Sequence, residues 1–253
     1  MTDFIYRLYY WPGLPGRGEF VRLLLEDAQL PYVDVARLPE AEGGGASAVR
    51  ELVEDGVDCY APPIFEFAPG KRIAQTANIC QYLGVTHDLV HEDPFDRMLA
   101  NQLQLTIADL VTEVHDTHHP IATGQHYEEQ REAALLRAAV FRQERLPKYF
   151  GFFERTIASM HNTFLLGARC TYPDLSLWHV LEGVAYAFPK AHAAIMKEYP
   201  RLRALKDTVG AREGIAAYVA SGRRMPFNER GIFRHYPELD GVVAEHDAAR
   251  EVL

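Results

Sequence analysis

Three short segments of this sequence carry residue types that can bind and activate a thiol. Tyr10 stands at the end of an apolar stretch, Pro62-Pro63 stands before another, and Gln75-Thr76 precedes an apolar helical pattern. A tyrosine hydroxyl donates a hydrogen bond, and a helix start offers free N–H groups to an anion. With an X-Pro turn between them, these parts predict a thiol-binding site, and the prediction rests on their order and spacing rather than on any single residue.

The elements that must position this site alternate between strand and helix in the first third of the chain. Aromatic and β-branched residues indicate strands, and apolar residues at helical spacing indicate helices. The expected elements are a strand at 4–10, a helix at 15–29, a strand at 31–35, a helix at 47–54, strands at 63–67 and 72–74, and a helix at 75–83 that Gly84 ends. This β-α-β-α-β-β-α order is typical of the thioredoxin-like fold.

The sequence after residue 94 shows only helical periodicity. Long helical segments are expected at 94–119, 126–159, 174–188 and 201–220, joined by short connections. The last thirty residues hold too many aromatic side chains for a free terminus. We therefore expect an α/β N-terminal thioredoxin-like domain at 1–84, a linker at 85–93, an all-α C-terminal helical bundle domain at 94–222, and a C-terminal extension at 223–253 that packs on the body.

Two of the expected helices carry start signals. Pro94 suits the first turn of a helix, where its missing N–H costs nothing. Thr171 and Asp174 have the spacing of a capping box, in which each side chain accepts a hydrogen bond from the other residue's N–H, and Cys170 and Leu175 form the accompanying hydrophobic staple. This motif predicts a structural device of about 1 kcal/mol without chemistry of its own.

Composition excludes several classes of function. The 253 residues carry a formal net charge of −9, so no basic face for nucleic acid is expected. No window approaches the run of about 20 apolar residues that spans a bilayer, and residues 1–7 lack the pattern of a secretory signal. We expect a cytoplasmic protein that binds neither nucleic acid nor membrane.

Cysteines and histidines do not suggest a metal. Cys59, Cys80 and Cys170 are far apart and show no C-x-x-C spacing, so reduced, mostly buried thiols are expected. His115 and His119 stand four residues apart near a helix end, with His118 and Asp116 between them, but no fourth ligand is identifiable. Surface or cleft-rim histidines are the preferred interpretation, and no metal site is predicted.

These segments give the chain a resemblance to the cytosolic glutathione transferases over most of its length. Residues 8–12 together with 16–19 resemble the N-terminal motif of the tyrosine-type classes, closest to sigma, pi and mu. Residues 62–65 resemble the cis-proline strand of that family, and residues 75–79 resemble its Gln-Ser-x-x-Ile helix start.

The resemblance implies glutathione as co-substrate and a catalytic role for two residues. Tyr10 would donate its hydroxyl to the glutathione sulfur, and Arg17 would support the thiolate by its charge. A free thiol titrates near about 8.5, and a hydrogen bond of about 1.5 to 3 kcal/mol to the thiolate lowers that pKa by about one to two units. The thiolate then becomes the main species at neutral pH.

The remaining glutathione contacts are also implied by the resemblance. Pro63 would be the cis proline that lets the main chain around Pro62 pair with the cysteinyl part of the tripeptide. Gln75 and Thr76 would bind the γ-glutamyl carboxylate at a helix N-terminus. Asp109 matches the position from which the family's partner subunit reaches the γ-glutamyl amine, so a homodimer is expected.

The sequence departs from the family pattern in three places. Pro62 has no N–H, so only its carbonyl can take part in the main-chain pairing. The loop before the Gly-Arg-Gly motif is longer than usual, which leaves Tyr9 open as an alternative thiol donor. Residues 38–61 lack the usual tryptophan and lysine for the glycyl carboxylate, and Arg50 or Arg37 are the candidate substitutes.

The expected activity is conjugation of glutathione to small apolar electrophiles, as in detoxification. The same thiolate could serve a glutathione-dependent peroxidase or isomerase. The alternative class is a non-catalytic protein of the same fold that binds ligands or has a structural role. Three aromatic residues of the extension, Phe227, Phe233 and Tyr236, are candidates for capping the electrophile pocket.

Overall fold

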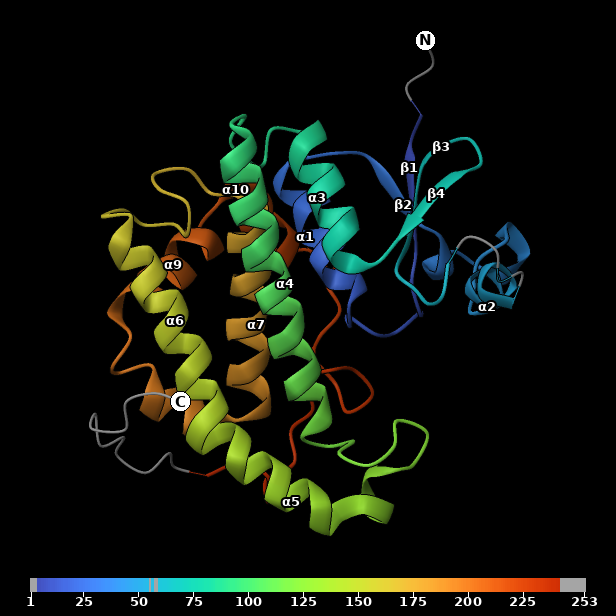
Figure 1. The fold of residues 1–253 in the computed structure, drawn as a ribbon. Helices are drawn as coiled ribbons and strands as arrows, with labels where there is room; N and C mark the ends of the chain where they lie inside the picture. Colours follow the sequence, from blue (N-terminus) through green and yellow to red (C-terminus); the bar gives the residue numbers. More distant parts are fainter. Residues whose placement is uncertain (1–3, 55, 57–58, 242–253) are drawn as a thin grey trace.

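A computed structural model describes residues 4–54, 56 and 59–241 (Figure 1). The first part of the chain forms a four-stranded sheet, in the order β2-β1-β3-β4. Its strands are β1 (Tyr6–Tyr9), β2 (Tyr32–Asp34), β3 (Ile64–Ala68) and β4 (Lys71–Ala74). β1 pairs with β2 in parallel and with β3 antiparallel, and β3 pairs with β4 antiparallel, so the sheet is mixed. Residues 1–3 of the expected first domain and 242–253 of the expected extension lie outside the described residues.

Both faces of this sheet carry apolar side chains, because successive side chains along a strand point to opposite faces. Leu8 and Phe65 face a large core shared with helices α1 (Gly18–Asp27) and α3 (Thr76–Thr86). Tyr9 and Ile64, the next residues along the same strands, belong to a second cluster under α2. Helix α2 (Ser47–Glu54) has the bounds expected from the sequence, and Figure 1 shows it on the opposite side of the sheet from α1 and α3.

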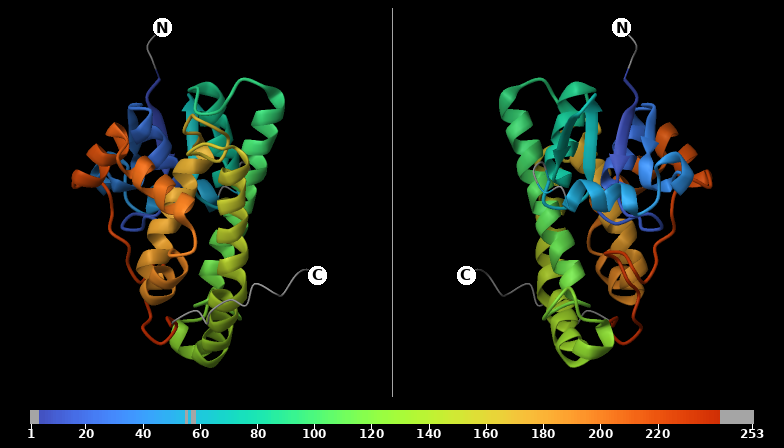
Figure 2. Two further views of the ribbon diagram at one scale, coloured as in Figure 1. Left: turned by 90° about the vertical axis from the view of Figure 1, so that its left-hand side faces the viewer. Right: turned by 90° about the vertical axis from the view of Figure 1, so that its right-hand side faces the viewer.

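The second part of the chain is all helical. Its helices are α4 (Pro94–Asp116), α5 (Arg131–Val140), α6 (Leu146–Ser159), α7 (Tyr172–Ala187), α8 (Pro189–Ile195), α9 (Pro200–Gly210) and α10 (Glu213–Ala220). Helix α7 is buried along most of its length and contacts α1, α4 and α9 (Figures 1 and 2). The predicted fold class, an α/β thioredoxin-like part followed by a helical bundle, is confirmed.

Both predicted helix starts are present. Asp93 accepts hydrogen bonds from the N–H groups of Phe95 and Asp96 in front of Pro94. The Thr171–Asp174 capping box is formed and wholly buried: Asp174 Oδ2 accepts from Thr171 N at 2.8 Å and from Thr171 Oγ1 at 2.6 Å. Asp174 Oδ1 also accepts from Leu165 N at 2.8 Å, so the box ties the preceding loop to α7.

Two expectations about helix ends were wrong. Gly84 does not end α3, which continues to Thr86. Its lack of a side chain serves packing instead, since a Cβ there would lie 2.4 Å from Tyr172 Cδ1. The segment at 201–220 is two helices, because α10 turns to approach α1 so closely that a Cβ on Gly214 would lie 2.4 Å from the Glu26 carbonyl oxygen.

Two further features of the helical part were not predicted from the sequence. Helix α8 is only seven residues long and starts at Pro189, which is too short for a periodic signal. The expected helix at 126–159 is broken into a 3₁₀ turn (Tyr127–Gln130), α5, a π turn (Phe141–Arg145) and α6. A single extra residue in a turn leaves the apolar pattern almost unchanged, so the sequence does not reveal it.

Candidate active site

Strand register brings the three predicted segments to one edge of the sheet. Tyr9 pairs with Ile64, so the next residues in this antiparallel register are Tyr10 and Pro63. Ile64 pairs with Ala74, which places Pro63 beside Gln75 in the same way. The strand end, the proline turn and the start of α3 therefore meet at one edge of the sheet, although 65 residues separate Tyr10 from Gln75 (75 − 10 = 65).

Tyr10 lies against the first turn of α1, and two glycines make the room for it. A Cβ on Gly18 would lie 2.6 Å from Tyr10 Cγ, and one on Gly16 would lie 2.2 Å from the Tyr10 hydroxyl oxygen. That oxygen accepts a hydrogen bond from Arg17 N at 2.9 Å. Because an N–H occupies the oxygen as acceptor, the phenol proton remains available for donation to a ligand.

Burial and the neighbouring arginines act in opposite directions on the pKa of Tyr10. Burial raises the pKa of Tyr10, while the Arg17 N–H and the charges of Arg17 and Arg22 act to lower it. Arg22 is fully buried: its Nη1 donates to the Pro15 carbonyl at 3.1 Å and its Nε donates to Asp34 Oδ2 at 2.7 Å. Its guanidinium carbon lies 5.9 Å from the centre of the Tyr10 ring.

Arg22 was missed by sequence reasoning, although it left a signal. A charged residue between Val21 and Leu23, on a helix whose neighbours are all buried, indicates a paired internal cation rather than a solvated one. Through the Pro15 carbonyl, Arg22 holds the loop that carries Arg17 N to Tyr10.

Tyr9 points to the other face of the sheet. Its side chain belongs to the cluster under α2, its hydroxyl donates to Glu66 Oε2 at 3.0 Å, and it accepts from Arg7 Nε at 3.1 Å. Consecutive residues of a strand project to opposite faces, so Tyr9 and Tyr10 cannot both face the edge described above. The geometry favours Tyr10 as the donor.

The peptide bond between Pro62 and Pro63 is cis. Pro63 is buried and Pro62 is partly exposed, directly before β3. The main chain at this turn offers the Pro62 carbonyl but no N–H, as the sequence indicated.

The start of α3 is open to an anion. Gln75 has φ +70° and ψ 118°, a sparsely populated conformation for a residue with a side chain, and such residues concentrate at functional sites. The side chain of the N-cap residue, Gln75, makes no capping bond, so it leaves the first N–H groups of α3 without the usual side-chain acceptor. Thr76 Oγ1 is buried and, among the residues described, has no hydrogen-bond partner.

Four other residues were predicted to contact glutathione or its thiolate, and most of them lie away from Tyr10. Arg17 is partly buried, and its guanidinium forms no ion pair with any residue in the described part of the chain. Arg50 is exposed on α2, and Asp109 is exposed on α4. Arg37 is engaged elsewhere, since its Nη1 donates to the Arg223 carbonyl at 2.6 Å. Of these residues, the structure places only Arg17 beside Tyr10.

The three histidines at the end of α4 form a compact group. Their ring centroids are 5.1 Å apart for His115 and His118, 5.0 Å for His115 and His119, and 4.8 Å for His118 and His119. His118 and His119 are buried rather than on the surface, because the Ile232 carbonyl covers His118 (2.8 Å from Nε2) and Gln130 covers His119. Burial lowers the pKa of His118 to about 3 and that of His115 to about 4. Nowhere in the ranges 4–54, 56 and 59–241 do three or more histidine, cysteine or acidic side chains gather as a metal site.

The chain after α10 runs down the outside of the helical part (Figure 2). We call residues 225–241 the tail. Phe227 stacks on His179 of α7, and Phe233 occupies the space left by Gly183, where a Cβ would lie 2.4 Å from Phe233 Cγ. Tyr236 stacks on Tyr127 with ring centroids 3.9 Å apart.

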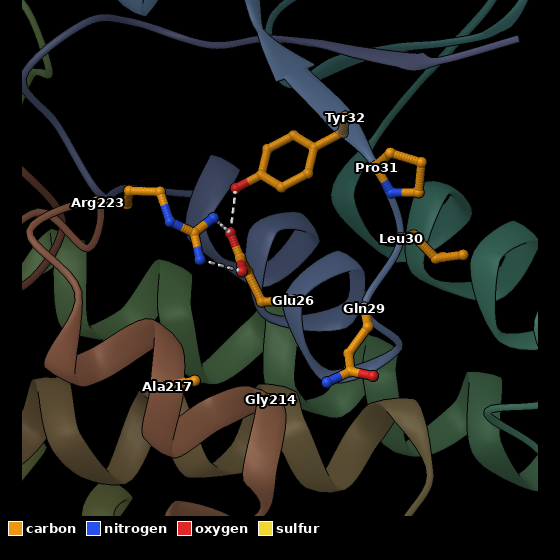
Figure 3. Close-up of a pocket in the computed structure, with 8 residues that line it drawn as sticks. All are labelled: Glu26, Gln29, Leu30, Pro31, Tyr32, Gly214, Ala217 and Arg223. Carbon is orange, nitrogen blue, oxygen red and sulfur yellow. Dashed lines mark hydrogen bonds and ion pairs between the residues drawn. The ribbon is translucent and has the colours of Figure 1, made fainter.

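Figure 3 shows a groove of about 400 Å³ between α1, β2 and α10. Its wall holds Glu26, whose carboxylate accepts from Arg223 Nη2 at 2.8 Å and from the Tyr32 hydroxyl at 2.9 Å. No predicted site residue lines this groove. Glu26, Tyr32 and Arg223 already pair with one another, and Arg223 fastens the segment just before the tail to α1.

Comparison with known proteins indicates which proteins this chain is similar to. Residues 115–222 match the family "Glutathione S-transferase, C-terminal domain". A glutathione S-transferase from Plasmodium yoelii yoelii is 22% identical over 210 residues, covering 81% of this chain and 89% of that protein. Glutathione S-transferase alpha I of Oryctolagus cuniculus is 27% identical over 228 residues, covering 89% and 93%.

Solved structures give the same result for the fold. Prostaglandin synthase D of Nilaparvata lugens matches with a TM-score of 0.68 at 19% identity, covering 88% of this chain and 100% of that one. The names of these relatives support the prediction of a glutathione S-transferase enzyme, and the solved structures show the fold. Within the residues that the structure describes, no helix is both long and apolar enough to cross a membrane.

Proposed function

We propose that this protein is a tyrosine-type glutathione transferase in which Tyr10 activates the glutathione thiol. The observation that carries the proposal is the Tyr10 hydroxyl, which accepts from Arg17 N at 2.9 Å and keeps its own proton for a ligand. The thiol proton leaves to solvent, and the thiolate that Tyr10 stabilises attacks a small electrophile. A C–S bond forms while either a π bond of the electrophile opens and its carbanion is protonated, or a leaving group departs with the electron pair of its bond. The protein acts as a cytoplasmic homodimer in detoxification-type conjugation.

The glutathione backbone is assigned to the sheet edge and the start of α3. The Pro62 carbonyl pairs with the cysteinyl N–H, and Thr76 with the first N–H groups of α3 binds the γ-glutamyl carboxylate, with Gln75 beside it. Arg50 is the candidate for the glycyl carboxylate. A buried hydroxyl without a partner costs free energy, and a bound carboxylate would remove that cost, which supports the role of Thr76.

Thr76→Val should weaken glutathione binding about tenfold, because it removes one hydrogen bond to a charged group at almost constant volume. Isothermal titration with glutathione measures the dissociation constant. Thr208→Val on α9, which removes an exposed hydroxyl bonded to the Ala204 carbonyl, is the matched control and should bind glutathione like the wild type. Unchanged binding in Thr76→Val would remove Thr76 from the site.

The homodimer is supported by one face of α4. Phe95, Met98 and Leu105 are 61%, 63% and 50% exposed, and they recur at helical spacing with exposed Asp109 at the end of the series. An apolar stripe of this kind is stabilised when a second copy covers it. A copy on this face would bring its Asp109 toward the neighbouring glutathione site.

Leu105→Glu should shift the protein from dimer to monomer, because it buries a charge in the interface. Sedimentation velocity over a tenfold range of concentration measures the change. Leu136→Glu on α5 introduces the same charge at a residue that is 72% exposed, and this control should stay dimeric. A dimer of equal stability in both variants would contradict the assignment of this face.

Retention on glutathione-agarose followed by turnover of chlorodinitrobenzene tests the function as a whole. Binding with turnover supports a transferase. Retention without turnover would favour a ligand-binding protein of the same fold, an alternative that the missing N–H of Pro62 supports. Turnover of organic hydroperoxides or an isomerisation under the same conditions would identify the other chemistries open to the thiolate.

A further inference from the structure

Glu19 is a buried carboxylate in the first turn of α1, and side chains from the helical part of the chain bind it. The Tyr218 hydroxyl of α10 donates to Glu19 Oε2 at 3.2 Å, and Arg224 Nε donates to Glu19 Oε1 at 3.3 Å. These two donors stand 199 and 205 residues further along the chain. A buried carboxylate is costly unless it is paired, so Glu19 fastens the end of the helical part to the start of α1.

Arg22, one turn later on α1, connects Glu19 to the loop before the helix. Arg22 Nη1 donates to Glu19 Oε2 at 3.4 Å and to the Pro15 carbonyl at 3.1 Å, and both charged side chains are fully buried. The Pro15 carbonyl also accepts from Glu19 N at 3.0 Å. Arg22 Nη2 has no partner among the residues described, so the bonds to Glu19, Pro15 and Asp34 set the direction of the guanidinium.

Pro15 begins the short loop that contacts the Tyr10 hydroxyl. Arg17, two residues later, donates its main-chain N–H to the Tyr10 oxygen at 2.9 Å. Gly16 between them has φ +45°, and a Cβ there would lie 2.2 Å from that oxygen, so the loop fits closely around the hydroxyl. The Arg22 guanidinium carbon lies 5.9 Å from the centre of the Tyr10 ring. A shift of the Pro15 carbonyl would therefore move Arg17 N relative to Tyr10.

The bond from Arg17 N affects how strongly Tyr10 can donate. Hydrogen bonds that share a group strengthen one another, because each bond polarises the next. The Tyr10 hydroxyl is a stronger donor while its oxygen accepts from Arg17 N. A looser loop at Pro15 therefore weakens the bond that Tyr10 would donate to a thiolate, although every group that touches the ligand is still present.

We propose that Glu19 is a positioning residue for the hydroxyl of Tyr10. Its carboxylate orients Arg22, and Arg22 holds the Pro15 carbonyl of the loop that contacts that hydroxyl. Docking of residues 218–224 on α1 then determines how well the N-terminal part of the chain activates a thiol. This inference rests on the proposed function of Tyr10, but its first step, the geometry of the loop, involves no ligand.

Amide hydrogen exchange tests the positioning without glutathione. Glu19→Gln keeps the size of the side chain and removes its charge, and exchange of the Arg17 N–H, measured by NMR on the full chain, should become at least about threefold faster. Tyr218→Phe removes a single hydroxyl bonded to Glu19 and should change the exchange in the same direction. Because Tyr218→Phe is the milder substitution, it decides the question if Glu19→Gln does not fold.

Tyr32→Phe is the matched control. Glu26, two turns after Glu19 on α1, accepts from the Tyr32 hydroxyl at 2.9 Å and from Arg223 Nη2 at 2.8 Å (Figure 3). The substitution removes the same kind of bond from the same helix, but in the described part of the chain the Glu26 carboxylate makes no bond to the loop before α1. Exchange should stay at the wild-type rate. Equal acceleration in Tyr32→Phe and Tyr218→Phe would overturn the proposal.

Ionisation of bound glutathione tests the consequence for chemistry. The ultraviolet absorbance of the thiolate gives the pKa of the thiol in the binary complex without turnover. This pKa should rise by about half a unit in Glu19→Gln and by less in Tyr218→Phe. Electrostatics alone predicts the opposite sign for Glu19→Gln, because loss of a nearby negative charge favours the thiolate. A fall or no change in the pKa, where the wild type ionises glutathione, would overturn the positioning role.

The dissociation constant of glutathione separates positioning from a general loss of structure. Measured at a pH where the thiol is protonated, it should stay within about twofold of the wild type in both variants, because no group that binds the tripeptide is removed. A parallel loss of binding and of thermal stability, without a rise in the thiol pKa, would make Glu19 a structural residue only.

The two readouts also separate this inference from the function on which it rests. A wild type that binds glutathione with the ordinary pKa of a free thiol rejects Tyr10 as the activating group. Exchange of the Arg17 N–H then still decides the positioning. Faster exchange in Tyr218→Phe but not in Tyr32→Phe supports it, and equal exchange in both rejects it.

Discussion

Tyr10→Phe should lower kcat/KM for chlorodinitrobenzene by about 10- to 100-fold at pH 7. The variant keeps the ring that packs on Gly18 and removes only the hydroxyl that accepts from Arg17 N. Loss of one hydrogen bond to the thiolate, worth about 1.5 to 3 kcal/mol, raises the pKa of bound glutathione by about one to two units. Less thiolate is then present at neutral pH.

The pH–rate profile shows whether this is the cause. In Tyr10→Phe the rising limb of kcat/KM should move to higher pH by the same one to two units, and the rates of variant and wild type should converge at alkaline pH. A loss that is independent of pH, or wild-type activity in the variant, would reject the role of Tyr10 in ionisation of the thiol.

Tyr9→Phe is the matched control for this experiment. It removes a neighbouring hydroxyl that bonds with Glu66 and Arg7 on the opposite face of the sheet. Activity should stay within about twofold of the wild type, while stability falls by about 1 kcal/mol because the Glu66 carboxylate loses a donor. The reverse pattern in the two variants would make Tyr9 the thiol donor.

Asp174→Ala should lower the free energy of unfolding by about 3 to 4 kcal/mol. The carboxylate is fully buried and accepts from Leu165 N, Thr171 N and Thr171 Oγ1. Its removal leaves three buried donors without an acceptor and opens a small cavity at the start of α7. Urea unfolding followed by far-ultraviolet circular dichroism measures the change.

Asp93→Ala gives the comparison at an exposed helix start. Asp93 caps α4 by accepting from Phe95 N and Asp96 N, but water can replace it there. Its loss should cost about 1 kcal/mol, the usual value for an N-cap. Equal effects of the two substitutions would mean that burial adds nothing to the Thr171–Asp174 box.

Several features of the site could be predicted from sequence because they depend on local chemistry. The strand that ends at Tyr9, the helix that starts at Thr76 and the capping box at Thr171 each follow from residue types a few positions apart. The cis bond before Pro63 was also expected, from the resemblance rather than from the residues. Long-range packing in the folded protein is compatible with these local preferences and leaves them unchanged.

Other features depend on contacts that no short pattern contains. Gly84 has the spacing of a helix end, yet Tyr172 packs on it and α3 continues. His118 has the sequence context of a surface residue, but the Ile232 carbonyl, 114 residues further on, covers it. Arg22 sits in a helical pattern that gives no hint of its partners Pro15 and Asp34.

Local patterns predicted the candidate site residues and the elements that carry them, because helix and strand periods, caps and proline turns act over a few residues. Tertiary structure alone decided which of two adjacent tyrosines faces the site, since a strand alternates its side chains and only its pairing register and packing decide which set turns inward. It also decided where the tail lies and which histidine it covers, because the contact between Ile232 and His118 joins segments that are 114 residues apart.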